Sequence, residues 1–206
     1  MCATRFFVFW AFWQILLELV RWLYMNNPKH GVTGNFSIEE DEIKSFMDLT
    51  KRVKPIKGQV FKDSKMVVDN QYRDVDVYHI ESEEESLYAI LQKVARTVNG
   101  YFNYEINGIE KAQVMKYTAP SNGYGWHIDI GADGIAAQRK IAVSILLNDD
   151  YEGGEMVFRT AEESEKVKPK IGEVVAFSSF ISHCVRPVTK GKRYVVVAWF
   201  TGPHFK

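Results

Sequence analysis

Residue types that could hold a metal ion gather in the second half of the chain, where His127 and Asp129 stand two positions apart in the segment GWHIDI. In an extended strand the side chains of residues i and i+2 project to the same face, so this imidazole and this carboxylate would converge on one point. A His-x-Asp pair is common by chance and supplies only two ligands. A third ligand is needed before the pair predicts a metal site.

His183 is the candidate for that third ligand. It lies just after the apolar segment EVVAFSS and just before VRPVT, so its imidazole stands beside sequence that is expected to be buried. Two imidazoles and one carboxylate on one face of a metal, with the opposite positions open, are the ligand set of non-haem Fe(II) that activates oxygen. A structural zinc site would instead use four protein ligands. The alternative for His183 is a core histidine that hydrogen-bonds to the backbone.

Arg193 provides a second indication of chemistry. Alternation along RYVVVAWF places Arg193 on the same face of a strand as Val195 and Trp199. If that face is the interior, the guanidinium is costly unless an anion pairs with it, and arginine binds carboxylates in a bidentate manner. The pattern then predicts a dicarboxylate that chelates the metal at one end and pairs with Arg193 at the other. The alternative is a surface arginine on an edge strand.

Helices are predicted before these motifs. A capping-box pattern at Ser37 and Glu40 begins an amphipathic helix that Pro55 ends. The same pattern at residues 82–85 begins a second helix, which stops at the Asn-Gly pair at 99–100. The segment between the two helices predicts weak strands and exposed loops.

After residue 100 the chain changes to short β-rich segments that are separated by turn clusters. These segments are QVMKY, GWHIDI, KIAVSILL, EMVF, EVVAFSS and RYVVVAWF. Helices first and strands afterwards favour an α+β, mainly β fold. We expect a double-stranded β-helix (jelly-roll) core flanked by the N-terminal helices, with the chemistry inside the barrel.

The N-terminus carries an apolar run over residues 6–25 that is interrupted by three polar or charged residues. The predicted organisation is therefore a hydrophobic extension over 1–24 and a single domain over 25–206. Within that domain, residues 35–100 form helical support and residues 101–203 form the jelly-roll core. The extension is either a membrane anchor or sequence upstream of a true start at Met25, and the latter is the preferred interpretation.

Composition restricts the partners. The chain has 206 residues, and its 26 Lys and Arg balance 26 Asp and Glu. This neutral balance gives no general attraction to nucleic acid, so we expect no nucleic-acid partner. The two cysteines stand far apart, which argues against a disulfide framework and favours a cytoplasmic location, with membrane anchoring as the alternative.

In its order of motifs the chain resembles the Fe(II)/2-oxoglutarate dioxygenases, which carry a His-x-Asp pair, a distal His and an Arg. The local sequence around the motifs resembles the prolyl 4-hydroxylase branch of this family. The segments that carry this likeness are QVMKYTAPSNGYGWHID, LLNDDYEGGEMVF and PKIGEVVAFSSFISHCVRPVTKGKRYVVVAWF. The likeness covers about residues 34–203 and is strong from residue 111. Collagen-type members have lysine at the position of Arg193, so the chain looks more like the bacterial and viral members.

The resemblance implies a role for each matching residue. His127, Asp129 and His183 would be the catalytic Fe(II) ligands, Arg193 would hold the distal carboxylate of 2-oxoglutarate, and Tyr117 would hydrogen-bond to it. The reaction would use O2, convert 2-oxoglutarate to succinate and CO2, and hydroxylate a C–H bond. Ascorbate is the expected reductant.

The resemblance identifies the substrate less clearly. The preferred substrate is a prolyl residue of a peptide or protein. The loops over 62–76 and 130–139 are the expected rims of the site, and Tyr72, Arg73 and Trp126 are candidate substrate contacts. One alternative is an oxygenase acting on a free amino acid or another small molecule. Another is a non-catalytic jelly-roll module that binds a metal or an anion. The oligomeric state is not predicted.

Overall fold

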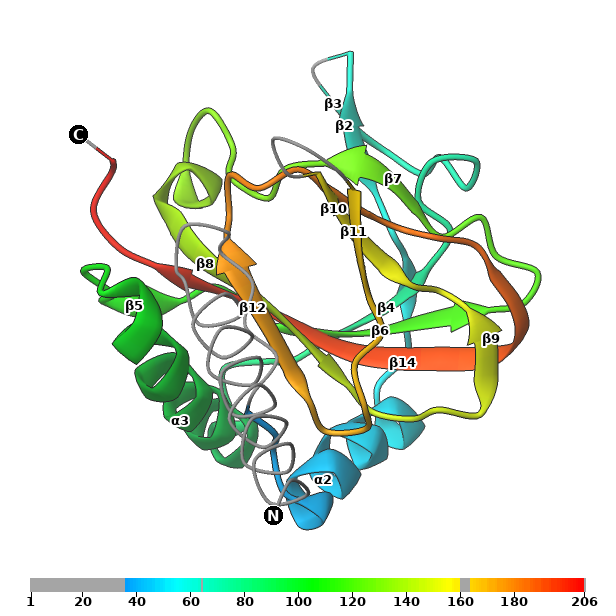
Figure 1. Ribbon diagram of the computed structural model, residues 1–206, viewed down its shortest axis with the longest axis horizontal. Coiled ribbons are helices and arrows are strands. Elements are labelled where there is room, and N and C mark those ends of the chain that lie inside the picture. The colour runs from blue at the N-terminus through cyan, green and yellow to red at the C-terminus, as the bar shows by residue number, and fades with distance from the viewer. Residues whose placement is uncertain (1–35, 64, 160–163, 206) are drawn as a thin grey trace, which may run out of the picture.

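The computed structural model describes residues 36–63, 65–159 and 164–205 (Figure 1). Its helices, strands and one 3-10 turn are, in chain order, α2 (Glu40–Arg52), β1 (Ile56–Lys57), β2 (Val60–Lys62), β3 (Lys65–Val67), β4 (Asp76–His79), α3 (Glu85–Phe102), β5 (Gly108–Ile109), β6 (Gln113–Thr118), β7 (Tyr124–His127), η2 (Ile135–Gln138), β8 (Arg139–Leu146), β9 (Tyr151–Gly153), β10 (Met156–Arg159), β11 (Ser164–Val167), β12 (Val174–Ser178), β13 (His183–Val185) and β14 (Val188–Thr201).

All strands of the described residues except β2 and β3 form two facing antiparallel sheets, which we call the major and the minor sheet. The major sheet has the order β1-β4-β6-β14-β8-β12, and β5 and β9 also pair with β14. The minor sheet has the order β11-β10-β13-β7. Figure 1 shows the two sheets on opposite sides of one barrel, with the long strand β14 (orange to red) running beside β6 in the major sheet. Strands that are neighbours in a sheet but distant in the chain give the jelly-roll core that the sequence predicts.

The long strand β14 is the centre of the major sheet, because it pairs with both β6 and β8. Its side chains alternate as predicted. Arg193, Val195 and Trp199 line the cavity inside the barrel, and the latter two share a buried cluster with residues of the minor sheet. Val196 and Phe200 belong to the cluster on the outer face. One strand therefore contributes to both hydrophobic cores of the domain.

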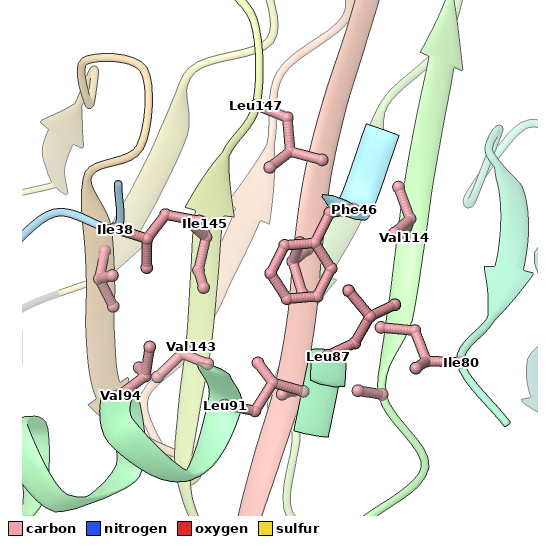
Figure 2. Packing of buried hydrophobic residues seen from close by; sticks show 14 of the residues in the cluster. Ile38, Phe46, Ile80, Leu87, Leu91, Val94, Val114, Val143, Ile145 and Leu147 are labelled. Carbon is pink, nitrogen blue, oxygen red and sulfur yellow. The ribbon is translucent and has the colours of Figure 1, made fainter. Parts of the chain in front are cut away.

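The outer face of the major sheet is covered by α2 and α3 (Figure 1). The buried stripe of α3 includes Leu87 and Leu91, which Figure 2 shows packed over the sheet together with Phe46 of α2. Fully buried side chains from the strands, such as Val114 and Ile145, complete this cluster. The predicted helical faces therefore exist and pack on the sheet, as the spacing of the apolar residues requires.

The helices do not begin where the sequence patterns place their caps, because neither Ser37 nor Ser82 caps a helix. The first turn of α2 instead uses Glu42, whose carboxylate accepts a hydrogen bond of 2.8 Å from the N–H of Glu39. Ser37 belongs to a short extended segment, in which the N–H of Ile38 donates to the carbonyl of Gly172. Pairing with a distant part of the chain outweighs the local capping signal here.

The end of α3 also differs from the prediction. The helix continues through Gly100 to Phe102, and Asn103 follows in the left-handed conformation with φ of 52°. The side-chain amide of Asn99 holds this end, because it donates to the carbonyl of Tyr104 and accepts from the N–H of the same residue. Asn99 therefore helps to end the helix from inside its last turn, while Gly100 is part of the helix.

The segment expected as helical support, residues 35–100, also contributes to the sheets. Strand β4 pairs with β6 and β1 pairs with β4, so both extend the major sheet, while β2 and β3 form a separate hairpin. The weak strands predicted for this region are thus present. In the residues described, no helix is both long and apolar enough to cross a bilayer. The predicted extension over residues 1–24 and the start at Met25 lie outside the described residues.

The packing of α3 predicts the effect of truncating its buried stripe. Leu91 has no exposed surface, so Leu91→Ala leaves a cavity under the helix and should lower the free energy of unfolding by about 3 kcal/mol. Urea denaturation followed by circular dichroism measures this loss. The neighbouring exposed residue provides the control, because Gln92→Ala should change the stability by less than about 0.5 kcal/mol. Equal effects of the two substitutions would contradict this packing.

Candidate metal centre

Three potential metal ligands meet at the open end of the barrel, between β7 and β13. His127 ends β7, His183 begins β13, and the two residues face each other in the register of the minor sheet. The Nε2 atoms of His127 and His183 lie 3.6 and 3.7 Å from the two carboxylate oxygens of Asp129. One ligand atom from each residue falls within 4.8 Å of the others. The structure thus brings together the three residues that the sequence singles out.

Asp129 reaches this cluster differently from the prediction, which assumed a continuous strand through residue 129. Strand β7 ends at His127, and Asp129 lies in a bend. The N–H groups of Asp129 and Ile130 both donate to the carbonyl of Ser179, at 2.9 and 3.0 Å. A loop contact between the two sides of the site therefore sets the position of the carboxylate.

Both imidazoles are oriented by the backbone. The Nδ1 atom of His127 lies 2.8 Å from the carbonyl of Gly125, and the Nδ1 atom of His183 lies 3.0 Å from that of Ile181. A carbonyl accepts only, so each Nδ1 carries a proton and each Nε2 is the ring nitrogen that faces the cluster. This is the outer hydrogen bond that orients metal-bound histidines. The alternative of a backbone-bonded core histidine accounts for one ring nitrogen only.

Aromatic rings enclose the two histidines. The ring of Tyr124 is stacked on His127 with centroids 3.6 Å apart, and Phe177 packs against His183 at 4.6 Å. The pKa of His127 is lowered to about 4, mainly by burial and to a smaller extent by the neighbouring His183, while Asp129 opposes the shift. Burial likewise raises the pKa of Tyr124 to about 12. Near pH 7, His127 is therefore a neutral ligand and Tyr124 keeps its hydroxyl proton.

Arg193 lies deeper in the barrel, opposite Tyr117 in the register of β14 and β6. Only 1% of Arg193 is exposed, and its Nε and Nη1 atoms have no hydrogen-bond partner among the described residues. Its guanidinium carbon lies 5.5 Å from the centre of the Tyr117 ring. Burial raises the pKa of Tyr117, so its hydroxyl remains a donor. A buried cation with free donors beside a neutral hydroxyl fits a carboxylate ligand.

One cavity of about 670 Å³ joins these groups, since the metal-ligand cluster, Arg193 and Tyr117 all line it. The predicted rims over 62–76 and 130–139 both contribute to its wall. Of the candidate substrate contacts, Tyr72 and Arg73 line the cavity. Trp126 is outside the lining, and its ring packs under the guanidinium of Arg159 at 4.6 Å.

The sequence interpretation missed Arg139, which lies beside the cluster. Its guanidinium binds both carboxylate oxygens of Glu110 at 2.5 and 2.6 Å and donates to the backbone carbonyl of Asp129 at 2.8 Å. The same group covers the ring of Trp199 at 4.0 Å. The spacing of Arg139 and Glu110 in the sequence gives no sign of this ion pair. The only sequence signal near it was Trp199, which alternation places on the same face of the strand as Arg193.

Comparison with known proteins identifies the barrel. A family model described as the 2OG-Fe(II) oxygenase superfamily matches residues 112–201. A PKHD-type hydroxylase from Synechococcus sp. (strain CC9902) is 35% identical over 80 residues, which are 38% of this chain and 36% of that protein. Human prolyl 3-hydroxylase 2 is 41% identical over 68 residues, 31% of this chain and 10% of that protein. The match thus spans little more than a third of the PKHD-type relative.

Solved structures show the same fold. A prolyl-4-hydroxylase from Pseudomonas putida superimposes with a TM-score of 0.67 at 17% identity, over 87% of this chain and 97% of that one. A prolyl hydroxylase from Trichoplax adhaerens, solved with a peptide of hypoxia inducible factor, gives a TM-score of 0.66 at 22% identity, over 92% of both chains. The likeness in fold therefore extends over most of this chain.

The matched segment begins just before β6 and ends with β14, so it contains every residue of the metal-ligand cluster and Arg193. Sequence match, topology and ligand geometry agree on one assignment. Residues 112–201 match the 2OG-Fe(II) oxygenase superfamily, and the fold is similar to that of solved prolyl hydroxylases.

Proposed function

We propose that this protein is a non-haem Fe(II)/2-oxoglutarate-dependent dioxygenase that hydroxylates a prolyl residue of a peptide or protein. The observation that carries the proposal is the cluster of His127, Asp129 and His183 in the same cavity as the unpaired buried guanidinium of Arg193. The donor set fits Fe(II), because two neutral imidazoles and one carboxylate leave coordination positions open. The guanidinium fits the far carboxylate of 2-oxoglutarate.

Each group of the chain has a separate task in this proposal. His127, Asp129 and His183 hold the iron, and Arg193 and Tyr117 hold 2-oxoglutarate through charge-assisted and neutral hydrogen bonds. Bound iron supplies the activation of O2, with decarboxylation of 2-oxoglutarate to succinate and CO2 and hydroxylation of the substrate. Ascorbate would serve as reductant.

The remaining lining keeps water away from the reacting atoms. Apolar side chains of both sheets surround the metal-ligand cluster, and Phe177 and Met156 are nearly without exposed surface. A dry lining strengthens the electrostatic contacts inside and suppresses side reactions of a strong oxidant. Trp199, only 5% exposed, continues this wall towards Arg139.

A peptide is the favoured substrate because the cavity opens between extended and exposed elements. The β2–β3 hairpin contributes Phe61 and Met66 to the lining, and 74% and 56% of these residues are exposed. Exposed apolar side chains at the mouth of a cavity are typical of a surface that binds another chain. The prolyl specificity rests on the named relatives and on sequence likeness. A free amino acid or another small molecule is the second candidate.

The proposed organisation is a single catalytic domain within 25–206, with a cytoplasmic location. The non-catalytic binding module is disfavoured, because His127, Asp129, His183 and Arg193 are all present and all face one cavity. A module that had lost catalysis would have no reason to keep all four.

The first test removes the carboxylate ligand. In Asp129→Ala, Fe(II) loses its only anionic protein ligand, so anaerobic addition of Fe(II) and 2-oxoglutarate should give no visible charge-transfer band. Succinate release should fall at least about 100-fold. The exposed carboxylate of Asp149 provides the control, and Asp149→Ala should keep the band. Full 2-oxoglutarate turnover in Asp129→Ala would contradict the assignment.

The second test replaces the buried guanidinium. Arg193→Met should raise the KM for 2-oxoglutarate at least about 30-fold, because a lost buried charge pair costs about 2 to 5 kcal/mol. Wild-type protein loaded with Mn(II) should gain melting temperature when 2-oxoglutarate is added, and the variant should not. Lys192→Met, on the opposite face of β14, is the control and should behave as wild type. An unchanged KM in Arg193→Met would refute the role.

The third test uses the pKa of His127, which burial lowers to about 4 in the folded protein, against an ordinary value of about 6.5 when unfolded. Between these values the unfolded chain binds the extra proton, so the metal-free protein should lose stability as the pH falls from about 6.5 to about 4. The loss from this residue should approach about 3 kcal/mol. Urea denaturation at several pH values measures it.

His127→Asn should show a correspondingly smaller loss over the same pH range. His204→Asn, an exposed position near the C-terminus, should follow the wild type. A pH dependence that is identical in wild type and His127→Asn would show that His127 does not titrate in this way.

A further inference from the structure

Arg73 places a positive charge at the rim of the cavity, close to the metal-ligand cluster. It precedes β4, forms a β-bridge with Tyr124 and lines the cavity. Its guanidinium carbon lies 4.8 Å from the centre of the Tyr124 ring, and that ring is stacked on His127 at 3.6 Å. One aromatic ring therefore separates this guanidinium from a metal ligand.

The hydrogen bonds of Arg73 leave part of its guanidinium free. Its Nη1 group donates to the carbonyl of Gln59 at 2.6 Å, and its buried Nε has no partner among the described residues. None of the ion pairs between described residues includes Arg73. Arg139, which lines the same cavity, is fully paired with Glu110. Five N–H donors on one guanidinium exceed what a single carbonyl can use.

With Fe(II) and 2-oxoglutarate bound, the other charges of the site would balance one another, so none would neutralise Arg73. The two charges of Fe(II), the carboxylate of Asp129, the two carboxylates of 2-oxoglutarate and the guanidinium of Arg193 cancel one another. Asp133 also lines the cavity, but it is exposed, and water screens it. A half-buried cation at the mouth of a neutral site attracts an anionic group of whatever enters.

We propose that Arg73 forms an anion-binding subsite that selects peptide substrates with a carboxylate next to the reacting residue. The proposal rests on the proposed function and names the substrate class more closely. The apolar side chains of Phe61 and Met66 on the hairpin and the ring of Tyr72 lie around the same rim. The favoured substrate combines one acidic group with apolar neighbours. The carboxylate belongs to a Glu or Asp side chain or to the end of a chain.

A purely structural role is the competing explanation, because Arg73 also ties Gln59 to β7 and covers Tyr124. A structural residue would change the affinity for all peptides together. A carboxylate-binding residue changes the ratio between an acidic peptide and its amide counterpart. The experiment therefore measures that ratio.

The probes are fluorescent peptides with one central proline, identical except for Glu or Gln beside it. Each is made with a C-terminal carboxylate and with a C-terminal amide. Binding to protein loaded with Mn(II) and 2-oxoglutarate is followed by fluorescence anisotropy, which needs no turnover. Wild type should bind one of the acidic forms about tenfold more tightly than its amide, as one charge-assisted hydrogen bond predicts. The arm that shows the preference identifies the source of the carboxylate.

Arg73→Gln should reduce this preference to less than about twofold. The control is Arg159→Gln, because Arg159 covers Trp126 as Arg73 covers Tyr124 but lies outside the cavity lining. It should keep the full preference. A preference that survives in Arg73→Gln, a wild type that does not distinguish acid from amide, or a wild type that binds no peptide would each overturn the proposal.

Electron paramagnetic resonance of free Mn(II) shows whether Arg73→Gln still holds the metal. If the variant does not hold the metal, the test is made on the wild type by measuring its preference for the acidic peptide at different ionic strengths. Its preference should then shrink between about 0.05 and about 0.5 M NaCl, and a preference that resists salt would overturn the proposal. Release of succinate from 2-oxoglutarate without peptide tests the proposed function separately. A protein that turns over 2-oxoglutarate but ignores peptide charge keeps the function and loses the subsite.

Discussion

The pairing of β13 with β7 is the contact on which the site depends. It sets His183 directly opposite His127, although the two residues are far apart in the chain. The register of this pairing shifts between His183 and Val185, so the two histidines form a pair at one end of the ladder, next to the irregularity. A slip of one residue would turn one imidazole to the other face of the minor sheet and remove a ligand.

A second constraint follows from placing polar groups inside an apolar barrel. The interior holds the guanidinium of Arg193 and the imidazole of His183, both almost without exposed surface. Each carries a burial cost that a ligand can offset, because a metal uses the Nε2 lone pairs and a carboxylate pairs with the guanidinium. The fold accepts unsatisfied polar atoms at the points where ligands would bind. Arg139 shows the contrast, since its ion pair with Glu110 is complete within the protein and holds the loop of Asp129.

Residue identity and alternation were sufficient to single out the three residues of the metal-ligand cluster and to predict the jelly-roll core, while the interior position of Arg193 was one of two alternatives. The apolar spacing of α3 likewise predicted its buried stripe. The details that failed depend on distant parts of the chain. Ser37 pairs with the segment before β12 in place of capping a helix, and Asp129 is set by the carbonyl of Ser179. The predicted contact between Trp126 and the substrate failed for a similar reason. Trp126 is outside the cavity lining, and the guanidinium of Arg159 on β10 covers its ring.

The two sheets divide the chemistry between them, and this division locates specificity. The minor sheet and the bend after β7 carry the metal-ligand cluster, while Arg193 and Tyr117 on the major sheet line the same cavity. All of these residues lie in the segment that matches the superfamily. The hairpin of β2 and β3, together with Tyr72 and Arg73, lines the same cavity but lies before that segment. A part of the chain outside the matched segment thus contributes to the cavity wall, and in the proposed enzyme substitutions there would change substrate binding while the metal-ligand cluster stays in place.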